Sequence, residues 1–151
     1  PRSTPRSTST AWSPATSRSF ARVSPRSAAS ASASAEMPVD APIRLLAGPD
    51  GEHFLPGALA LLTASTYRIL PSSNRVGTRL DGPALPRSAV ADVSRPMVIG
   101  AIEVPGDGKP IVLGPEHPTT GGYPIVAVVA RADLGRLFSI RLGGSVRFTR
   151  D

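Results

Sequence analysis

The chain has 151 residues, a formal net charge of +6 and no cysteine. The lack of cysteine excludes disulfides and thiolate metal sites, and the two histidines, His53 and His117, lie too far apart in sequence to predict a zinc site, so no metal is expected. No apolar run approaches the roughly 18 residues of a membrane span, so we expect no membrane partner and a cytoplasmic location.

Residues 1–38 consist almost entirely of Ser, Ala, Arg, Pro and Thr. Such a segment cannot bury enough apolar surface to offset its ordering entropy, so a disordered tail is predicted. The tail carries five arginines against one glutamate, whereas the remainder carries 12 basic and 10 acidic side chains. The remainder is nearly balanced and has no basic cluster interleaved with aromatics, so no nucleic-acid partner is expected.

The origin of the tail has two readings. Its Arg- and Ser-rich, acid-poor composition resembles an organellar transit peptide, which makes organellar targeting the alternative to a cytoplasmic location. GC-rich or out-of-frame coding sequence produces similar text, so a non-native extension stays open as well.

The folded part begins with three predicted elements. A short strand is expected at residues 43–47, ended by the Gly-Pro-Asp-Gly turn at residues 48–51. Residues 55–64 are predicted to form a helix, because leucines recur there at helical spacing and a proline suits its first turn. A second strand is expected at residues 66–70.

Residues 73–83 are predicted to be extended, which places Arg75, Gly77 and Arg79 on one face and Val76, Thr78 and Leu80 on the other. Two guanidiniums on one face can bind a carboxylate or bicarbonate, because each offers paired donors in a fixed geometry. The alternative is a solvated strand face, or ion pairs with acids such as Asp81 and Asp92.

Short elements separated by turns continue to the end of the chain. The expected strands are 97–104, 110–113, 125–130 and 146–149, with a hairpin turn at 105–109 and a short helix at 132–138. Many short strands, frequent turns and two short helices predict a mainly β barrel or sandwich.

The run 118–124, Pro-Thr-Thr-Gly-Gly-Tyr-Pro, stands directly before the predicted strand 125–130. Adjacent glycines allow positive φ and a close approach of the backbone to another group. The candidate binding groups are Thr119, Thr120, Gly121, Gly122 and Tyr123, whose hydroxyls and N–H groups could face a developing oxyanion. The alternative is a tight connection whose glycines solve a packing problem.

Three further polar residues have ordinary structural explanations. Glu103 could act as a general base, but an ordinary polar strand position is favoured. His117 is expected to be an exposed loop residue, and Asp133 to cap or begin the helix at 132–138. No Ser-His-Asp arrangement and no phosphate-binding loop is visible in the sequence, so the catalytic residues stay unknown and no ATP site is assigned to this chain.

Five ordered residue groups resemble the carboxyltransferase subdomain C and D family. These groups are residues 73–83, 100–105, 107–113, 119–124 and 131–137. The family includes allophanate hydrolase subunit 2-like proteins, the KipA sporulation regulator, the C subunit of bacterial 5-oxoprolinase and the carboxyltransferase region of urea carboxylase. The resemblance covers residues 43–151 and implies a cyclophilin-like β-barrel.

The resemblance also implies a partner, a subdomain A and B protein that is similar to KipI or to the B subunit of 5-oxoprolinase. In the enzymes of the family the complex performs ATP-dependent 5-oxoproline hydrolysis, or carboxyl transfer from carboxybiotin to an amide-like substrate. ATP or biotin would enter only through the complex. Arg75, Arg79 and residues 119–123 would contact the substrate.

The sequence departs from the family pattern in several places. Family members are longer than the region matched here, so residues 43–151 are interpreted as the C-terminal half of the domain, in an incomplete barrel. Glu103 stands where the family has Gln, Thr78 where an aromatic is usual, and residues 116–118 replace Asp-Ala-Gln. We therefore expect a truncated subunit that is inactive alone. The alternatives are a non-catalytic KipA-like regulatory module and a non-functional gene fragment with exposed edge strands.

Overall fold

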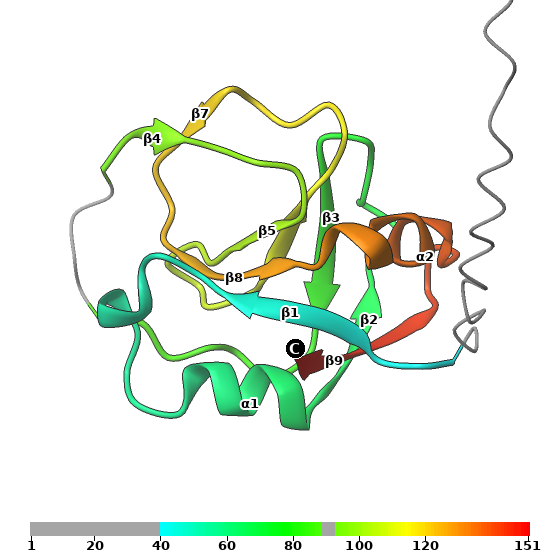
Figure 1. Cartoon of the computed structure of the whole chain (residues 1–151), viewed down its shortest axis with the longest axis horizontal. Coiled ribbons are helices and arrows are strands. Elements are labelled where there is room, and N and C mark those ends of the chain that lie inside the picture. Colours follow the sequence, from blue (N-terminus) through cyan, green and yellow to red (C-terminus); the bar gives the residue numbers. More distant parts are fainter. Residues whose placement is uncertain (1–39, 89–92) are drawn as a thin grey trace, which may run out of the picture. The chain divides into compact units, whose positions relative to one another are not determined.

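The computed structural model of the chain describes residues 40–88 and 93–151 (Figure 1). The expected disordered tail at 1–38 lies outside these residues, as does Asp92. The helices, in chain order, are the 3-10 helix η1 (Gly51–His53), α1 (Ala58–Ala64), the 3-10 helix η2 (Arg131–Asp133) and α2 (Leu134–Ser139). The strands are β1 (Ile43–Ala47), β2 (Thr66–Ile69), β3 (Gly77–Asp81), β4 (Arg95–Pro96), β5 (Ala101–Glu103), β6 (Ile111–Leu113), β7 (Thr120–Gly121), β8 (Ile125–Val129) and β9 (Ser145–Arg150).

Seven strands form a closed barrel in the order β1-β8-β5-β6-β3-β2-β9. Neighbouring strands run antiparallel except β1 and β9, whose parallel pairing places Ile43 opposite Phe148 and closes the ring. The predicted mainly β fold with two short helices and a barrel is therefore confirmed. The barrel was expected to be incomplete, and this part of the prediction is wrong, because β9 bonds to both β2 and β1 and leaves no gap in the ring.

The interior of the barrel follows from the alternation of its strands. In β2, Tyr67 and Ile69 are buried while Thr66 and Arg68 are exposed, as a period of two requires. The fully buried Tyr67 ring packs against Phe148, with 6.2 Å between the ring centroids, and its hydroxyl donates to the Pro83 carbonyl at 3.1 Å. In Figure 1, α1 lies along the lower side of the barrel, and α2 lies at the right.

A two-stranded ribbon lies over the outer face of the barrel. Strands β4 and β7 pair with each other, outside the ring, and appear above β5 and β8 in Figure 1. Beneath them is a second apolar cluster, formed by Met97, Ala101, Leu113 and Ile125. The ribbon therefore covers apolar side chains that point outward from β5, β6 and β8.

Several boundaries differ from the sequence prediction for local reasons. The strand expected at 97–104 is reduced to β5 because Gly100 adopts a φ of 81° and turns the chain. The helix expected from residue 55 begins at Ala58, since Gly57 before it has a φ of 92° and the Leu55 N–H bonds to the Pro86 carbonyl at 3.0 Å. Neither strand of the outer ribbon was predicted.

Candidate functional site

Arg79 and Glu103 lie in one row on the outer face of the barrel. Arg79 of β3 and Glu103 of β5 both pair with Ile111 of the intervening β6, one from each side. Paired residues on neighbouring strands point to the same face, and two strand spacings separate these Cα atoms by about 10 Å. Arg79 is exposed and Glu103 half-buried, so both long side chains border the same patch of outer surface.

The surroundings of Glu103 shift the pKa of its carboxyl group. Burial raises the pKa of Glu103 above its usual value, and the positive charge of Arg79 partly opposes that increase. The protonated form of Glu103 is thus favoured more than in an exposed glutamate. Sequence reasoning favoured an ordinary polar position for Glu103, because its burial and its neighbour across β6 could not be read from the chain.

The run 118–124 is attached to the segments that flank β5. The Thr119 carbonyl accepts a hydrogen bond from the Met97 N–H at 2.9 Å, and the Pro124 carbonyl accepts one from the Val104 N–H at 3.0 Å. The second bond joins the backbone of Val104, which follows Glu103, to that of Pro124, which follows Tyr123. The structure thus attaches the predicted loop to the chain on both sides of β5, the strand that carries Glu103.

The side chains of this loop face outward. Thr119 and Thr120 are exposed, and Tyr123 is 39% exposed. Their three hydroxyls have no hydrogen-bond partner among residues 40–88 and 93–151. They are therefore open to a ligand at the surface.

The two glycines of the loop do not adopt the positive φ that their pairing suggested. A Cβ at Gly121 would lie 2.4 Å from the Met97 Cε, so this residue is small because the apolar cluster packs against it. At Gly121 the packing explanation therefore holds, because the lack of a side chain leaves room for Met97.

Arg75 lies outside β3, in a bend at residues 75–76, so the extended run predicted for 73–83 does not include it. The Asn74 Oδ1 accepts hydrogen bonds from the N–H groups of Val76 and Gly77, at 2.9 and 3.2 Å, and the resulting turn delays the start of β3 to Gly77. The Arg75 side chain is 73% exposed and lies 2.5 Å from the Glu116 carboxylate. Arg75 borders a pocket of about 480 Å³ whose apolar lining includes Leu137, Phe138, Ile140 and Leu142.

Asp50 positions the ribbon and was missed by sequence reasoning. Its buried carboxylate accepts the Ile125 N–H at 2.7 Å and pairs with the Arg95 guanidinium, which joins β4 to the start of β8. In the sequence Asp50 is part of a Gly-Pro-Asp-Gly turn, where aspartate is ordinary. No local signal could have identified its long-range contacts.

The contacts of His117 and Asp133 are structural. The His117 Nδ1 lies 2.8 Å from the Pro118 carbonyl, close to the backbone of its own loop. Asp133 stands at the N-cap position, where α2 begins, as one of the two predicted alternatives has it; the other, a side-chain cap, is not formed, because its carboxylate binds Arg44 instead.

The described part of the chain has neither a candidate metal site nor a candidate membrane span. Within residues 40–88 and 93–151, no three His, Asp or Glu side chains are grouped so that they could bind a metal ion. None of the helices there combines the length and the apolar character needed to cross a bilayer.

Known proteins share sequence and structure with this chain. It is 36% identical over 109 residues to the C subunit of 5-oxoprolinase from Escherichia coli, and the match covers 72% of this chain and 35% of that protein. The protein of the same name from Haemophilus influenzae is 37% identical over 83 residues, which cover 54% of this chain and 27% of that protein. The chain thus spans about a third or less of the length of these relatives.

A solved structure is similar to this chain as well. The crystal structure of K. lactis urea amidolyase matches with a TM-score of 0.66 and 25% identity, over 72% of this chain and 7% of that chain. The barrel described above is therefore shared with a part of this larger protein.

A protein-family model also matches the chain. The model described as "Carboxyltransferase domain, subdomain A and B" matches residues 8–150. The resemblance to the carboxyltransferase domain and to the C subunit of 5-oxoprolinase is thereby confirmed, whereas the label of subdomains C and D and the assignment to a C-terminal half are not. The match covers most of the chain, which belongs to the family of carboxyltransferase domains, subdomain A and B.

Proposed function

We propose that this chain supplies a substrate-contacting face to a cytoplasmic complex that processes an amide-type substrate, of the 5-oxoprolinase or urea amidolyase kind. The observation that carries the proposal is that Arg79 and the half-buried Glu103 lie in one outer row of the barrel, with the loop 119–123 bonded to the segments on either side of β5. This arrangement combines a cation, a carboxyl that is more readily protonated than usual, and exposed hydroxyls.

Each group has a distinct proposed role. Arg79 binds a carboxylate or bicarbonate oxygen through its paired N–H donors. The hydroxyls of Thr119, Thr120 and Tyr123 donate to, or accept from, the rest of the substrate. Arg75 is paired with Glu116, so we assign it a smaller part in binding the same substrate.

Glu103 is proposed to bind substrate by hydrogen bonding rather than to abstract a proton. The family resemblance places Gln at this position, and a protonated carboxyl matches a carboxamide in shape and in offering one donor group beside one acceptor oxygen. The raised pKa of Glu103 favours that protonated form. An amide substrate presents the complementary acceptor and donor.

The partner and any cofactor belong to the proposal as well. The chain spans about a third of the C subunit of 5-oxoprolinase, and the proposed complex includes a partner similar to KipI or to the B subunit of 5-oxoprolinase. The chain has no glycine-rich Lys-Ser/Thr phosphate loop, and no step is assigned to ATP or biotin here. On this view the chain is inactive alone.

The test is co-expression of the chain with a protein similar to the B subunit of 5-oxoprolinase, followed by an ATP-dependent 5-oxoproline hydrolysis assay. We expect Glu103→Gln to retain turnover and Glu103→Leu to lower kcat/KM by about 10- to 100-fold, the cost of one lost hydrogen bond in a desolvated site. Exposed Arg131→Ala serves as the control. Equal activity of Glu103→Leu and the parent complex would remove Glu103 from the site.

The pH profile separates hydrogen bonding from base catalysis. If the protonated carboxyl is the active form, activity of the parent complex falls as pH rises through the raised pKa of Glu103, whereas Glu103→Gln lacks this fall. A base would give the opposite sign and an inactive Gln variant. Binding of the partner without any turnover would instead support the KipA-like regulatory alternative.

A further inference from the structure

The positive charge of the folded part is concentrated in its last segment. Residues 131–151 contain five arginines and two aspartates, whereas residues 40–130 contain seven basic and eight acidic side chains. The segment forms η2, α2 and β9, so its arginines are gathered on neighbouring elements. A local excess of this kind attracts acidic partners.

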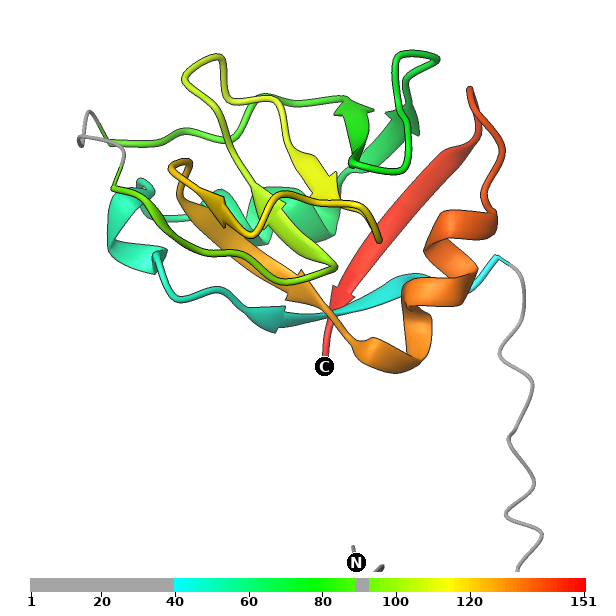
Figure 2. The same ribbon diagram turned by 90° about the horizontal axis from the view of Figure 1, so that it is seen from above.

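A groove of about 840 Å³ lies within this region, between residues 40–43, α2 and β9. In Figure 2 these three segments lie side by side at one end of the barrel. The groove is bordered by Arg136, Arg141 and Arg147, its apolar lining includes Ile43, Ile140 and Val146, and its hydroxyls come from Thr66, Ser139 and Ser145. It contains none of the residues of the candidate site on β3, β5 and the loop 119–123.

Two of the arginines are held in place by backbone oxygens. The Arg136 guanidinium donates to the Ala41 carbonyl and lies 3.4 Å from the Asp133 carboxylate. The Arg147 Nη2 lies 3.4 Å from the Asp40 backbone oxygen. These contacts hold both guanidiniums at the groove without neutralising Arg147.

The charge of the groove is not balanced by its own surroundings. No carboxylate among residues 40–88 and 93–151 forms an ion pair with Arg141 or Arg147. Asp133 is already bound by Arg44 at 3.0 Å. Asp40 is the acidic residue of the lining, and its backbone oxygen rather than its carboxylate contacts Arg147.

We propose that this groove docks an acidic segment of a partner protein, with carboxylates on Arg141 and Arg147 and an apolar side chain against Ile140 and Val146. Paired N–H donors suit carboxylates, and an apolar lining suits a side chain that alternates with them. The proposal does not depend on the function proposed above, because the groove shares no residue with that site.

Two other occupants fit less well. The tail at 1–38 carries five arginines and one glutamate, so like charges oppose its docking here. A nucleic acid would gain from aromatic side chains on which bases stack, and none lines this groove.

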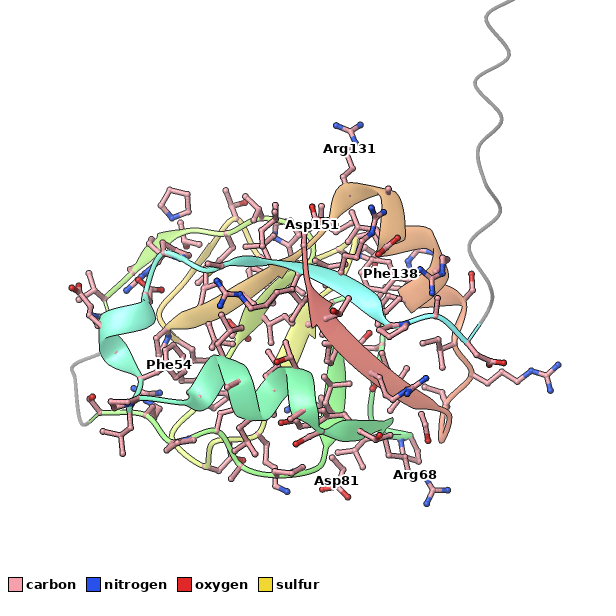
Figure 3. All side chains as sticks on the ribbon, turned by 60° about the horizontal axis from the view of Figure 1, so that its bottom comes forward. Phe54, Arg68, Asp81, Arg131, Phe138 and Asp151 are labelled. Carbon is pink, nitrogen blue, oxygen red and sulfur yellow. The ribbon has the colours of Figure 1, made fainter. Side chains whose placement is uncertain are left out.

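The experiment measures binding of a fluorescein-labelled Glu-Leu repeat peptide of about eight residues to the full chain by anisotropy, with a Lys-Leu repeat as the opposite-charge control. We expect the double variant Arg141→Glu, Arg147→Glu to weaken binding of the Glu-Leu peptide by about tenfold or more, since two attractive contacts become repulsive. Arg131→Glu makes a matched control: Arg131 is exposed, does not line the groove, and points away from the fold in Figure 3. We expect less than about twofold change there.

Thermal melts verify that each variant folds, and backbone amide shifts locate the peptide. Shifts confined to residues 139–147 support docking in the groove. The proposal is overturned if the parent chain does not bind the Glu-Leu peptide, if Arg131→Glu weakens binding as much as the double variant, or if the Lys-Leu peptide or a single-stranded DNA oligonucleotide binds more tightly.

Discussion

At the residue scale, Asp133 ties the barrel to the segment before α2. Its carboxylate accepts the Arg44 backbone N–H at 2.8 Å and the Arg44 Nε at 3.0 Å. These hydrogen bonds and the nearby positive charges lower the pKa of Asp133 from 3.8 to about 2, against the opposing effect of its burial. A residue that the sequence assigned to a helix cap thus stabilises contact with β1.

The lowered pKa makes a prediction about acid stability. A depressed carboxyl pKa contributes stability that is fully present above pH 3.8 and is lost as pH falls toward 2. We expect this contribution to be about 1–2 kcal/mol after allowing for the solvent that reaches Arg44. Denaturant titrations at pH 7 and pH 2.5 check it: Asp133→Asn should lower stability mainly at pH 7. An equal effect at both pH values would contradict the assignment.

Arg79 and Glu103 make a second prediction at this scale. Burial raises the pKa of Glu103 while Arg79 lowers it, so Arg79→Ala should raise the pKa of Glu103 further. The carboxyl carbon resonance of Glu103, followed by NMR through a pH titration, reports the change. Glu103→Gln identifies the resonance by its loss. An unchanged or lower pKa would show that the two side chains do not interact on the outer face.

At the scale of elements, the β4–β7 ribbon is anchored by a buried ion pair as well as by the apolar cluster beneath it. Strands of two residues supply few ladder bonds, and Asp50 adds the link from Arg95 to the Ile125 N–H. The ribbon carries Thr120 and Gly121, so the anchor also sets the position of the candidate loop. Burial of the pair costs desolvation energy, but removal of one partner leaves the other charge buried and unpaired, so breaking the pair is strongly destabilising.

Asp50→Ala is therefore expected to lower the free energy of unfolding by about 3 kcal/mol and to speed amide exchange in residues 119–123. Asp81→Ala provides the control, because its pair with Lys109 is exposed at 3.1 Å and should contribute about 1 kcal/mol or less. Chemical denaturation and hydrogen exchange measure the two effects. Equal costs for both variants would mean that Asp50 does not anchor the ribbon.

At the scale of the whole molecule, the last strand closes the barrel. Strand β9 pairs with β2 on one side and with β1 on the other, and it brings the buried Val146 and Phe148 into the core. Because the closing residues are the last of this chain and pair with nearly the first of the described ones, the fold depends on contacts of very long sequence separation. Closure also leaves no unpaired edge in the ring.

Removal of residues 145–151 should therefore abolish cooperative thermal unfolding. The milder Phe148→Ala should cost about 3–5 kcal/mol as a large core side chain is deleted. The exposed Arg147→Ala on the same strand is the control and should change stability by less than about 0.5 kcal/mol. Calorimetry distinguishes these results. A cooperative transition in the shortened chain would contradict the role of β9 in closure.

Local patterns predicted much of the fold. The strand at 43–47 is confirmed, the runs at 110–113 and 125–130 contain β6 and β8, and the helix at 132–138 is α2 shifted by one to two residues. These segments succeed because apolar periodicity and turn residues act over a few neighbours. The ribbon was missed because Arg95–Pro96 and Thr120–Gly121 are too short and too polar to carry such a pattern.

The candidate site, like the fold, could be predicted only in part from the sequence. The sequence by itself determined the kind of groups available, namely the hydroxyl-rich loop at 119–123, the two arginines of 75–79 and the family resemblance. Only the tertiary structure decided how they are arranged: the register of β3, β6 and β5 places Arg79 and Glu103 in one row on either side of Ile111, and the Asn74 turn leaves Arg75 outside β3. Local turns depend on residues that are neighbours in the sequence, whereas strand register and burial depend on contacts between segments far apart in the chain.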